Sequence, residues 1–146
     1  MLIERDDVDI NAKDENGQTP LYLAVNNWRE DVVKLLIERA DIDINAQDNR
    51  EETPLFYAAW DGNEDVVQLP IERNDVNIYA KDEDGMTALI AAAQNGNETV
   101  VRLLIEGSNA DINTKDRDGA TPLIFAAEGG HEAVVRLLIL QLCGTA

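Results

Sequence analysis

The sequence is poor in the residues on which most catalytic and metal sites depend. Its 146 residues include one histidine, one cysteine and one serine. A single cysteine, Cys143, excludes a disulfide within the chain and a metal site built from cysteines. His131 and Cys143 stand at opposite ends of one predicted helix, too far apart for a nucleophile and its base, and no base stands beside Ser108. We therefore expect no catalytic residue, no metal site, no cofactor and no enzyme activity.

Basic residues and long apolar runs are scarce as well. The chain has 12 Lys and Arg against 29 Asp and Glu, a net charge of −17. So acidic a chain repels phosphate groups, and we expect it to bind neither nucleic acid nor a membrane surface. It contains no run of about 18 apolar residues and no signal peptide pattern. The expected location is cytoplasmic, inside the cell.

What the sequence has in abundance is internal repetition. Threonines recur at intervals of 34 residues, at Thr19, Thr53, Thr87 and Thr121. The same interval separates an aspartate, a leucine and an alanine in each of four copies, at Asp14, Asp48, Asp82, Asp116, Leu21, Leu55, Leu89, Leu123, Ala24, Ala58, Ala92 and Ala126. One such unit cannot bury its own apolar residues, so the copies are predicted to stack into a solenoid.

Each copy predicts two helices and no strand. Thr19 and Pro20 form a helix start, because threonine can cap a free backbone N–H and proline suits the first helical position. Gly62, Gly96 and Gly130 stand where the first helix ends and a left-handed residue is favoured. In the first copy, Val32 to Ile37 carry apolar side chains at helical spacing, which predicts a second, amphipathic helix.

The repeated segments closely resemble the ankyrin repeat. The resemblance lies in GQTPLYLAV, GMTALIAAA and GATPLIFAAEGGHEAVVRLLI, and in the turns DINAKDENG and DINTKDRDG. It implies an all-α ankyrin-repeat solenoid of stacked helix-turn-helix units with projecting turns. A single domain, 1–146, would comprise a remnant of a preceding repeat at 1–13 and copies at 14–47, 48–81, 82–115 and 116–146. Runs such as LLIER and DIDINAQD are similar to arrays in large fungal multidomain proteins.

The resemblance implies non-catalytic recognition of a partner protein on the concave face, formed by the turn tips and the first helices. Carried over position by position, it nominates ten partner-binding residues: Trp60, Arg50, Asp61, Glu52, Met86, Asn26, Asn27, Asp84, Gln94 and Arg117. Trp60 stands where the other copies have Asn26, Gln94 and Glu128, so packing does not demand an aromatic side chain there. It is either a binding hot spot or a cover for the neighbouring copy.

Other functions stay open on the sequence alone. The chain could be a regulatory fragment of a larger enzyme or signalling protein, or an isolated or engineered array with no dedicated partner. Apolar residues at both ends, such as Leu140 and Leu142, would also suit self-association through uncapped terminal repeats.

Several positions depart from the family pattern. Pro70 replaces a leucine inside the second helix of the second copy, where we expect a bent or broken helix and the weakest copy. Glu51 replaces a turn glycine and is predicted to have a positive φ. Trp28 replaces a loop glycine, and we expect it to pack locally. The family's histidine is missing, and its inter-repeat hydrogen bonds should be absent or replaced by apolar packing at Tyr22, Phe56, Ile90 and Ile124.

Overall fold

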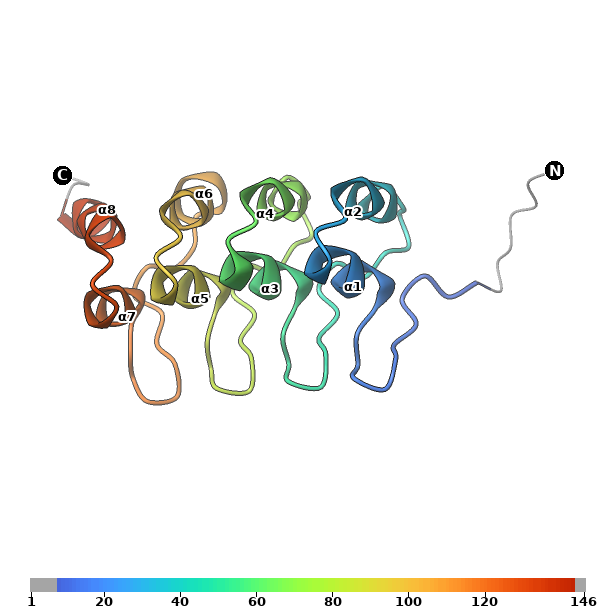
Figure 1. Ribbon diagram of the computed structural model, residues 1–146, viewed down its shortest axis with the longest axis horizontal. Coiled ribbons are helices and arrows are strands. Elements are labelled where there is room, and N and C mark those ends of the chain that lie inside the picture. Colours follow the sequence, from blue (N-terminus) through green and yellow to red (C-terminus); the bar gives the residue numbers. More distant parts are fainter. Residues whose placement is uncertain (1–7, 144–146) are drawn as a thin grey trace.

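The computed structural model describes residues 8–143, which form eight α-helices and no strand. The helices follow one another in four pairs that stand side by side along the long axis of the molecule (Figure 1). Their bounds are α1 (Pro20–Asn26), α2 (Glu30–Ile37), α3 (Pro54–Asp61), α4 (Glu64–Ile71), α5 (Ala88–Gln94), α6 (Glu98–Ser108), α7 (Pro122–Glu128) and α8 (Glu132–Cys143). The predicted all-α solenoid is confirmed. The predicted remnant at 1–13 lies partly outside the described residues.

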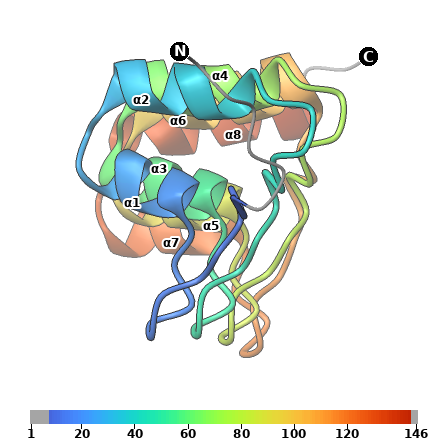
Figure 2. The same cartoon turned by 90° about the vertical axis from the view of Figure 1, so that its right-hand side faces the viewer.

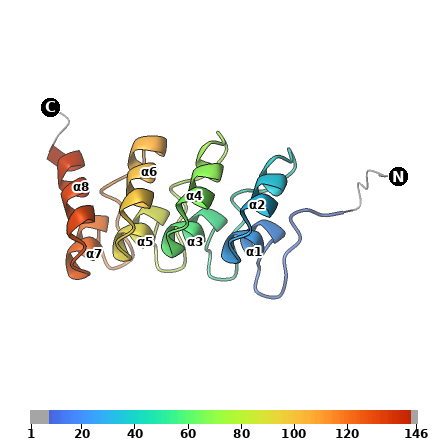
Figure 3. The same ribbon diagram turned by 45° about the horizontal axis from the view of Figure 1, so that its top comes forward.

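The pairs build two helical layers. The inner helices α1, α3, α5 and α7 pack in order against one another, and so do the outer helices α2, α4, α6 and α8. Seen along the row, the outer layer lies above the inner layer, and long turns project below it (Figure 2). We call these turns the fingers, residues 9–19, 43–53, 77–87 and 111–121. The outer helices lie side by side in a tilted view (Figure 3).

The inner helices begin at the predicted threonines. The Oγ1 atom of Thr53 accepts a hydrogen bond from the backbone N of Phe56, and the other three threonines cap their helices in the same way. Gly62 and Gly96 follow α3 and α5 with φ of 76° and 73°, in the left-handed region as predicted. Glu51 also has a positive φ, of 64°, which confirms the prediction for that position.

Trp28 holds the equivalent loop position in the first copy, with a φ of 57°. It does not pack locally, because 57% of its surface is exposed. Its indole Nε1 instead donates a hydrogen bond to Asp61 of α3, in the next copy. This contact between copies corrects the expectation of local packing.

Small residues allow the inner helices to approach one another closely. Ala58 and Ala59 of α3 face Ala92 and Ala93 of α5 across the shared core, and all four side chains are buried. The apolar residues of α4 and α6 cover this layer from the outside, so each copy buries its apolar stripe only through its neighbours.

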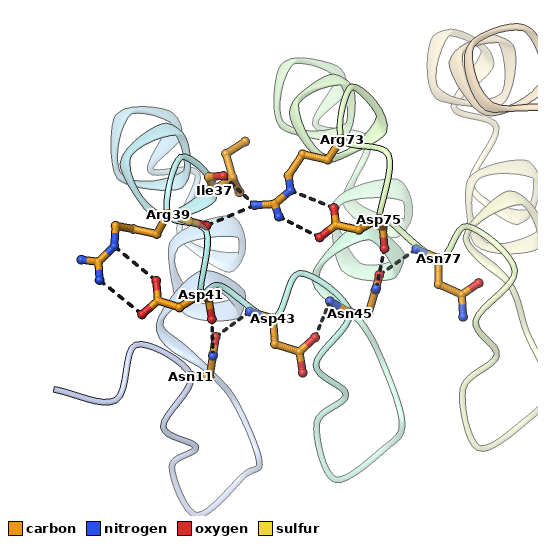
Figure 4. A network of polar contacts seen from close by, with 9 residues as sticks. All are labelled: Asn11, Ile37, Arg39, Asp41, Asp43, Asn45, Arg73, Asp75 and Asn77. Atoms are coloured by element: carbon orange, nitrogen blue, oxygen red, sulfur yellow. Dashed lines mark hydrogen bonds and ion pairs between the residues drawn. The ribbon is translucent and has the colours of Figure 1, made fainter. Parts of the chain in front are cut away.

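Polar side chains join neighbouring copies on the side of the outer-helix ends (Figure 4). Asn45 donates from Nδ2 to the carbonyl of Asp75 at 2.8 Å and accepts from the backbone N of Asn77 at 2.7 Å. Asn11 makes the same pair of bonds one copy earlier. Tyr79 stands at this position in the third turn, and its hydroxyl donates to the carbonyl of Asn109 at 3.1 Å.

A second link in this network is Arg73. Its Nη1 donates to the carbonyl of Ile37 at 2.7 Å, while Nη2 lies 2.7 Å from a carboxylate oxygen of Asp75 (Figure 4). The Asp75 carboxyl has a lowered pKa because it accepts hydrogen bonds from Arg73. A cation at the last carbonyls of a helix also interacts favourably with the helix dipole. Arg73 thus ties the end of α2 to the copy that follows it.

Helix α4 continues through Pro70. It runs from Glu64 to Ile71 and is eight residues long, as is α2 at the equivalent positions. The prediction of a broken helix is therefore wrong. The physical reason is position: Pro70 lies in the last turn, one residue before the helix ends. Its ring can disturb only the carbonyl of Val66, and no long stretch of helix follows to be misaligned.

The missing family histidine has different consequences in different copies. Phe56 and Ile90 are buried and apolar, as predicted. Tyr22 is also buried, but its hydroxyl donates to Oε2 of Glu52 at 3.1 Å. The first copy therefore keeps a polar link to the second, which corrects the expectation there.

Candidate functional site

The fingers are held in shape by their aspartates. Oδ1 of Asp82 accepts hydrogen bonds from the backbone N of Asp84 and of Met86, each at 2.9 Å. Asp48 does the same for Arg50 and Glu52. The carbonyl of Arg50 then accepts from the backbone N of Glu83 at 3.0 Å, which joins the second finger to the third. The finger backbones therefore form a continuous edge with little freedom to shift.

A cleft of about 340 Å³ lies where the second and third fingers meet α3 and α5. Six of the ten predicted partner-binding residues line it: Arg50, Glu52, Trp60, Asp84, Met86 and Gln94. Its other lining residues are Phe56, Tyr57 and Asp82. We call this set of nine residues the cleft. The side chain of Trp60 is 41% exposed there.

The other four predicted residues lie outside the cleft. Asn26 ends α1, and Asn27 follows it, donating from Nδ2 to the carbonyl of Leu23. Asp61 is occupied by the indole of Trp28. Arg117 lies in the fourth finger beside a separate, more open hollow. The ten predicted residues thus do not share one hollow, and six of them gather where the second and third copies meet.

Sequence reasoning missed Phe56, Tyr57 and Asp82. In the sequence, Phe56 stands out only because it replaces the family histidine, and Asp82 only because it recurs at the 34-residue interval. Tyr57 could have been noticed in the repeat alignment, because its position varies between the copies: the equivalent residues are Leu23, Ala91 and Phe125. Its ring packs against Tyr22 with 5.6 Å between centroids, at the first-copy end of the cleft.

Two buried carboxyl groups give the cleft its electrostatic character. Glu52 is 9% exposed and Asp82 is 7% exposed. Burial raises the pKa of both side chains above their ordinary values. Arg50 offsets the cost of burying Glu52 only in part, because its guanidinium group is shared between two carboxylates. Its Nε lies 3.8 Å from Oε1 of Glu52 and 3.4 Å from Oε1 of the exposed Glu83. The cleft therefore holds carboxylates that lack full compensation.

These raised pKa values predict how stability depends on pH. A carboxyl whose pKa is higher in the folded than in the unfolded chain binds its proton more tightly when folded. The free energy of unfolding therefore falls as the pH rises from the pKa of the unfolded chain through the pKa of the folded chain. We expect urea unfolding to show a more stable protein at about pH 5 than at about pH 7.5. Replacing Glu52 by Gln should raise stability at the higher pH and flatten this dependence.

Glu15→Gln is the matched control, because it removes the same charge at the tip of the first finger, where the side chain is exposed. If the loss of one negative charge from this acidic chain were the cause, stability would change equally in both variants. Equal pH slopes in the Glu52→Gln and Glu15→Gln proteins would contradict the prediction.

Gln94 contributes an acceptor that has no donor. Its Oε1 atom is buried and has no hydrogen-bond partner among residues 8–143. The backbone carbonyl of the same residue accepts from Nε2 of His131 at 2.9 Å, a structural bond between the third and fourth copies. Gln94 also lines the cleft, together with Trp60 of the preceding inner helix.

The fourth copy leaves an apolar face uncovered in the described chain. Ile90 of α5 is 0% exposed, whereas its equivalent in α7, Ile124, is 44% exposed. Ile139 and Leu140 of α8 are exposed as well. At the α5 equivalent of Ile124, Ile90 is covered by the fourth copy, whereas Leu140 stands where α6 has the exposed Glu106.

Two further properties of the described chain bear on the site. Within residues 8–143, no group of three or more histidine, cysteine or acidic side chains is arranged so that it could hold a metal ion. None of the helices described here has the length and apolar character needed to cross a membrane.

Comparison with known proteins agrees with the geometry. The family model for ankyrin repeats (3 copies) matches the chain over residues 1–82 and again over residues 61–145. No curated protein matches the chain at a significant level.

Proposed function

Since the chain belongs to the ankyrin-repeat family, whose members are generally protein–protein interaction modules, we propose that it binds a partner protein on its concave face, centred on the cleft. The family is typically non-catalytic, and the role proposed is recognition alone. The observation that carries the proposal is the gathering of an exposed tryptophan, an arginine and a methionine with buried carboxyls in one hollow.

Trp60 is the expected centre of this interface. In protein–protein interfaces, tryptophan and arginine are enriched among the residues whose replacement by alanine weakens binding most. Such residues cluster where water is excluded. Packing of the solenoid does not require the ring, because the equivalent positions carry polar side chains. The bonds that Trp60 makes to Asn95 and Asn97 use only its backbone carbonyl, so an alanine would keep them.

We expect Trp60→Ala to weaken partner binding by at least about 2 kcal/mol, or roughly thirtyfold in Kd, with little change in melting temperature. The experiment is affinity capture from the source cells with the natural chain, Trp60→Ala and Trp28→Gly as parallel baits. Binding of each retained protein is then measured by calorimetry.

Trp28→Gly is the matched control. It also removes an exposed tryptophan, but from outside the cleft, and the equivalent positions are Gly62, Gly96 and Gly130. A protein retained by the natural chain and by Trp28→Gly but lost with Trp60→Ala supports the proposal. Proteins retained equally by all three baits, or no retained protein that depends on Trp60, would refute it. Equal retention would direct attention to the apolar face of α7 and α8.

A further inference from the structure

The chemistry of the cleft specifies the side chain that it can accept. It combines three features: the buried carboxyls of Glu52 and Asp82, the exposed carboxylate of Asp84 and the ring of Trp60. The three carboxylates in this set accept hydrogen bonds. Only an occupant rich in donors satisfies them.

The charge of the lining favours a cation. Three carboxyl groups face one guanidinium group, and that group, on Arg50, is already shared between Glu52 and Glu83. In Asp82, both bonds from the finger backbone go to Oδ1, and Oδ2 takes part in neither. An ionised carboxylate that is largely removed from water gains most from a cation placed against it.

We infer that the cleft takes an arginine side chain of the partner protein, with its guanidinium group against the carboxylates of Asp84 and Asp82 and its flat face on the ring of Trp60. The inference rests on the proposed function, because it specifies what the partner inserts at that site. A guanidinium group has five donors in a rigid plane, stacks on tryptophan and is weakly hydrated. An ammonium group is a strongly hydrated point charge with three donors and cannot stack on the ring.

The size of the hollow agrees with one long side chain. Its volume of about 340 Å³ is near the lower end of the volumes of ligand sites. A whole helix of the partner, which is about 10–12 Å across with its side chains, would be too wide to enter it. The rest of the partner would then lie over the fingers, whose tips carry mixed charges.

The test is an NMR titration of the 15N-labelled chain with Nα-acetyl-arginine amide. The matched ligand is Nα-acetyl-citrulline amide, which has the same shape but no charge, and Nα-acetyl-lysine amide tests the guanidinium group. The chain has two tryptophans, so the indole signal of Trp60 reports on the cleft and that of Trp28 is an internal control.

We expect the arginine compound to shift the Trp60 indole and the Gln94 side-chain amide signals saturably, with the Trp28 indole unmoved. Citrulline and lysine compounds should bind at least about tenfold more weakly. Asp84→Asn should weaken the arginine compound by a similar factor, whereas Asp118→Asn, the equivalent change in the fourth finger, should leave it unchanged. Equal shifts with citrulline, equal binding by lysine, an unaffected Asp84→Asn variant or no saturable shift would each overturn the inference.

Failure here is distinguishable from failure of the proposed function. If the arginine compound does not bind while Trp60-dependent capture of a protein persists, the inference falls and the recognition role stands. If the compound binds but no protein depends on Trp60, the recognition role falls and the chemistry of the cleft stands.

Discussion

Replacing Pro70 by leucine is expected to stabilise the protein by about 3 kcal/mol. The proline lacks the backbone N–H that would bond the carbonyl of Val66, and its ring crowds that carbonyl. Leucine restores the bond. An apolar gap of about 10 Å³ lies between the first two copies, bounded by Val33, Val66 and Pro70 among others, and the leucine side chain would extend into it. At the equivalent positions, Leu104 and Leu138 are almost completely buried.

The gain should raise the melting temperature by roughly 6–12 °C for a chain of this length. Amide exchange should show the second copy as the least protected in the natural chain and should show α4 gaining most in the variant. Pro20→Ala is the control: Pro20 stands at the first position of α1, where no N–H is missed, and the third copy already carries Ala88 there. An unchanged or lower melting temperature for Pro70→Leu would contradict the argument.

Leu104→Pro, the reverse exchange two helices further along, should be severely destabilising. Leu104 is 0% exposed, and α6 continues for four residues beyond it to Ser108. Its carbonyl accepts from the backbone N of Ala110 and from Oγ of Ser108, so a distortion there also disturbs the end of the helix. An interior proline costs about 3 kcal/mol, and the lost leucine packing adds about 2 kcal/mol or more.

A total near 5 kcal/mol is comparable with the whole stability of many domains. We therefore expect loss of protection in α6 and α8 by amide exchange, with the first copy less affected. Leu104→Met keeps the volume and the backbone bond, and it should cost less than about 1.5 kcal/mol. The argument fails if Leu104→Pro melts within a few degrees of the natural chain.

The contrast between these two positions shows where sequence reasoning stops. The interval of 34 residues correctly aligned Pro70 with Leu104, and proline chemistry correctly identified a lost hydrogen bond. The length of each outer helix depends on its end, which differs between copies. Arg73 bonds the end of α2, whereas Gly107 stands at its equivalent in α6, and α6 runs on to Ser108. The alignment of the copies shows the exchange of arginine for Gly107, but it does not show how far α6 extends.

The candidate site was predictable in part for the same reason. Variable positions on the fingers and inner helices are visible in the repeat alignment, and six of the predicted residues do line the cleft. The cleft itself depends on pairs of different residues in neighbouring copies. Glu52 is buried because Tyr22 of the preceding copy reaches it, and Asp61 is excluded because Trp28 binds it. The 34-residue period identifies the residues that all copies share, whereas these contacts are made by residues that differ between copies.

The position of the cleft has a thermodynamic consequence. In a stack where each unit contacts only its neighbours, stability is a sum of unit terms and nearest-neighbour couplings. The cleft takes its walls from both the second and the third copies, so an occupant bridges that junction and acts as an added coupling term. It would suppress independent opening of the second copy, which carries Pro70, and make the two halves of the array unfold together.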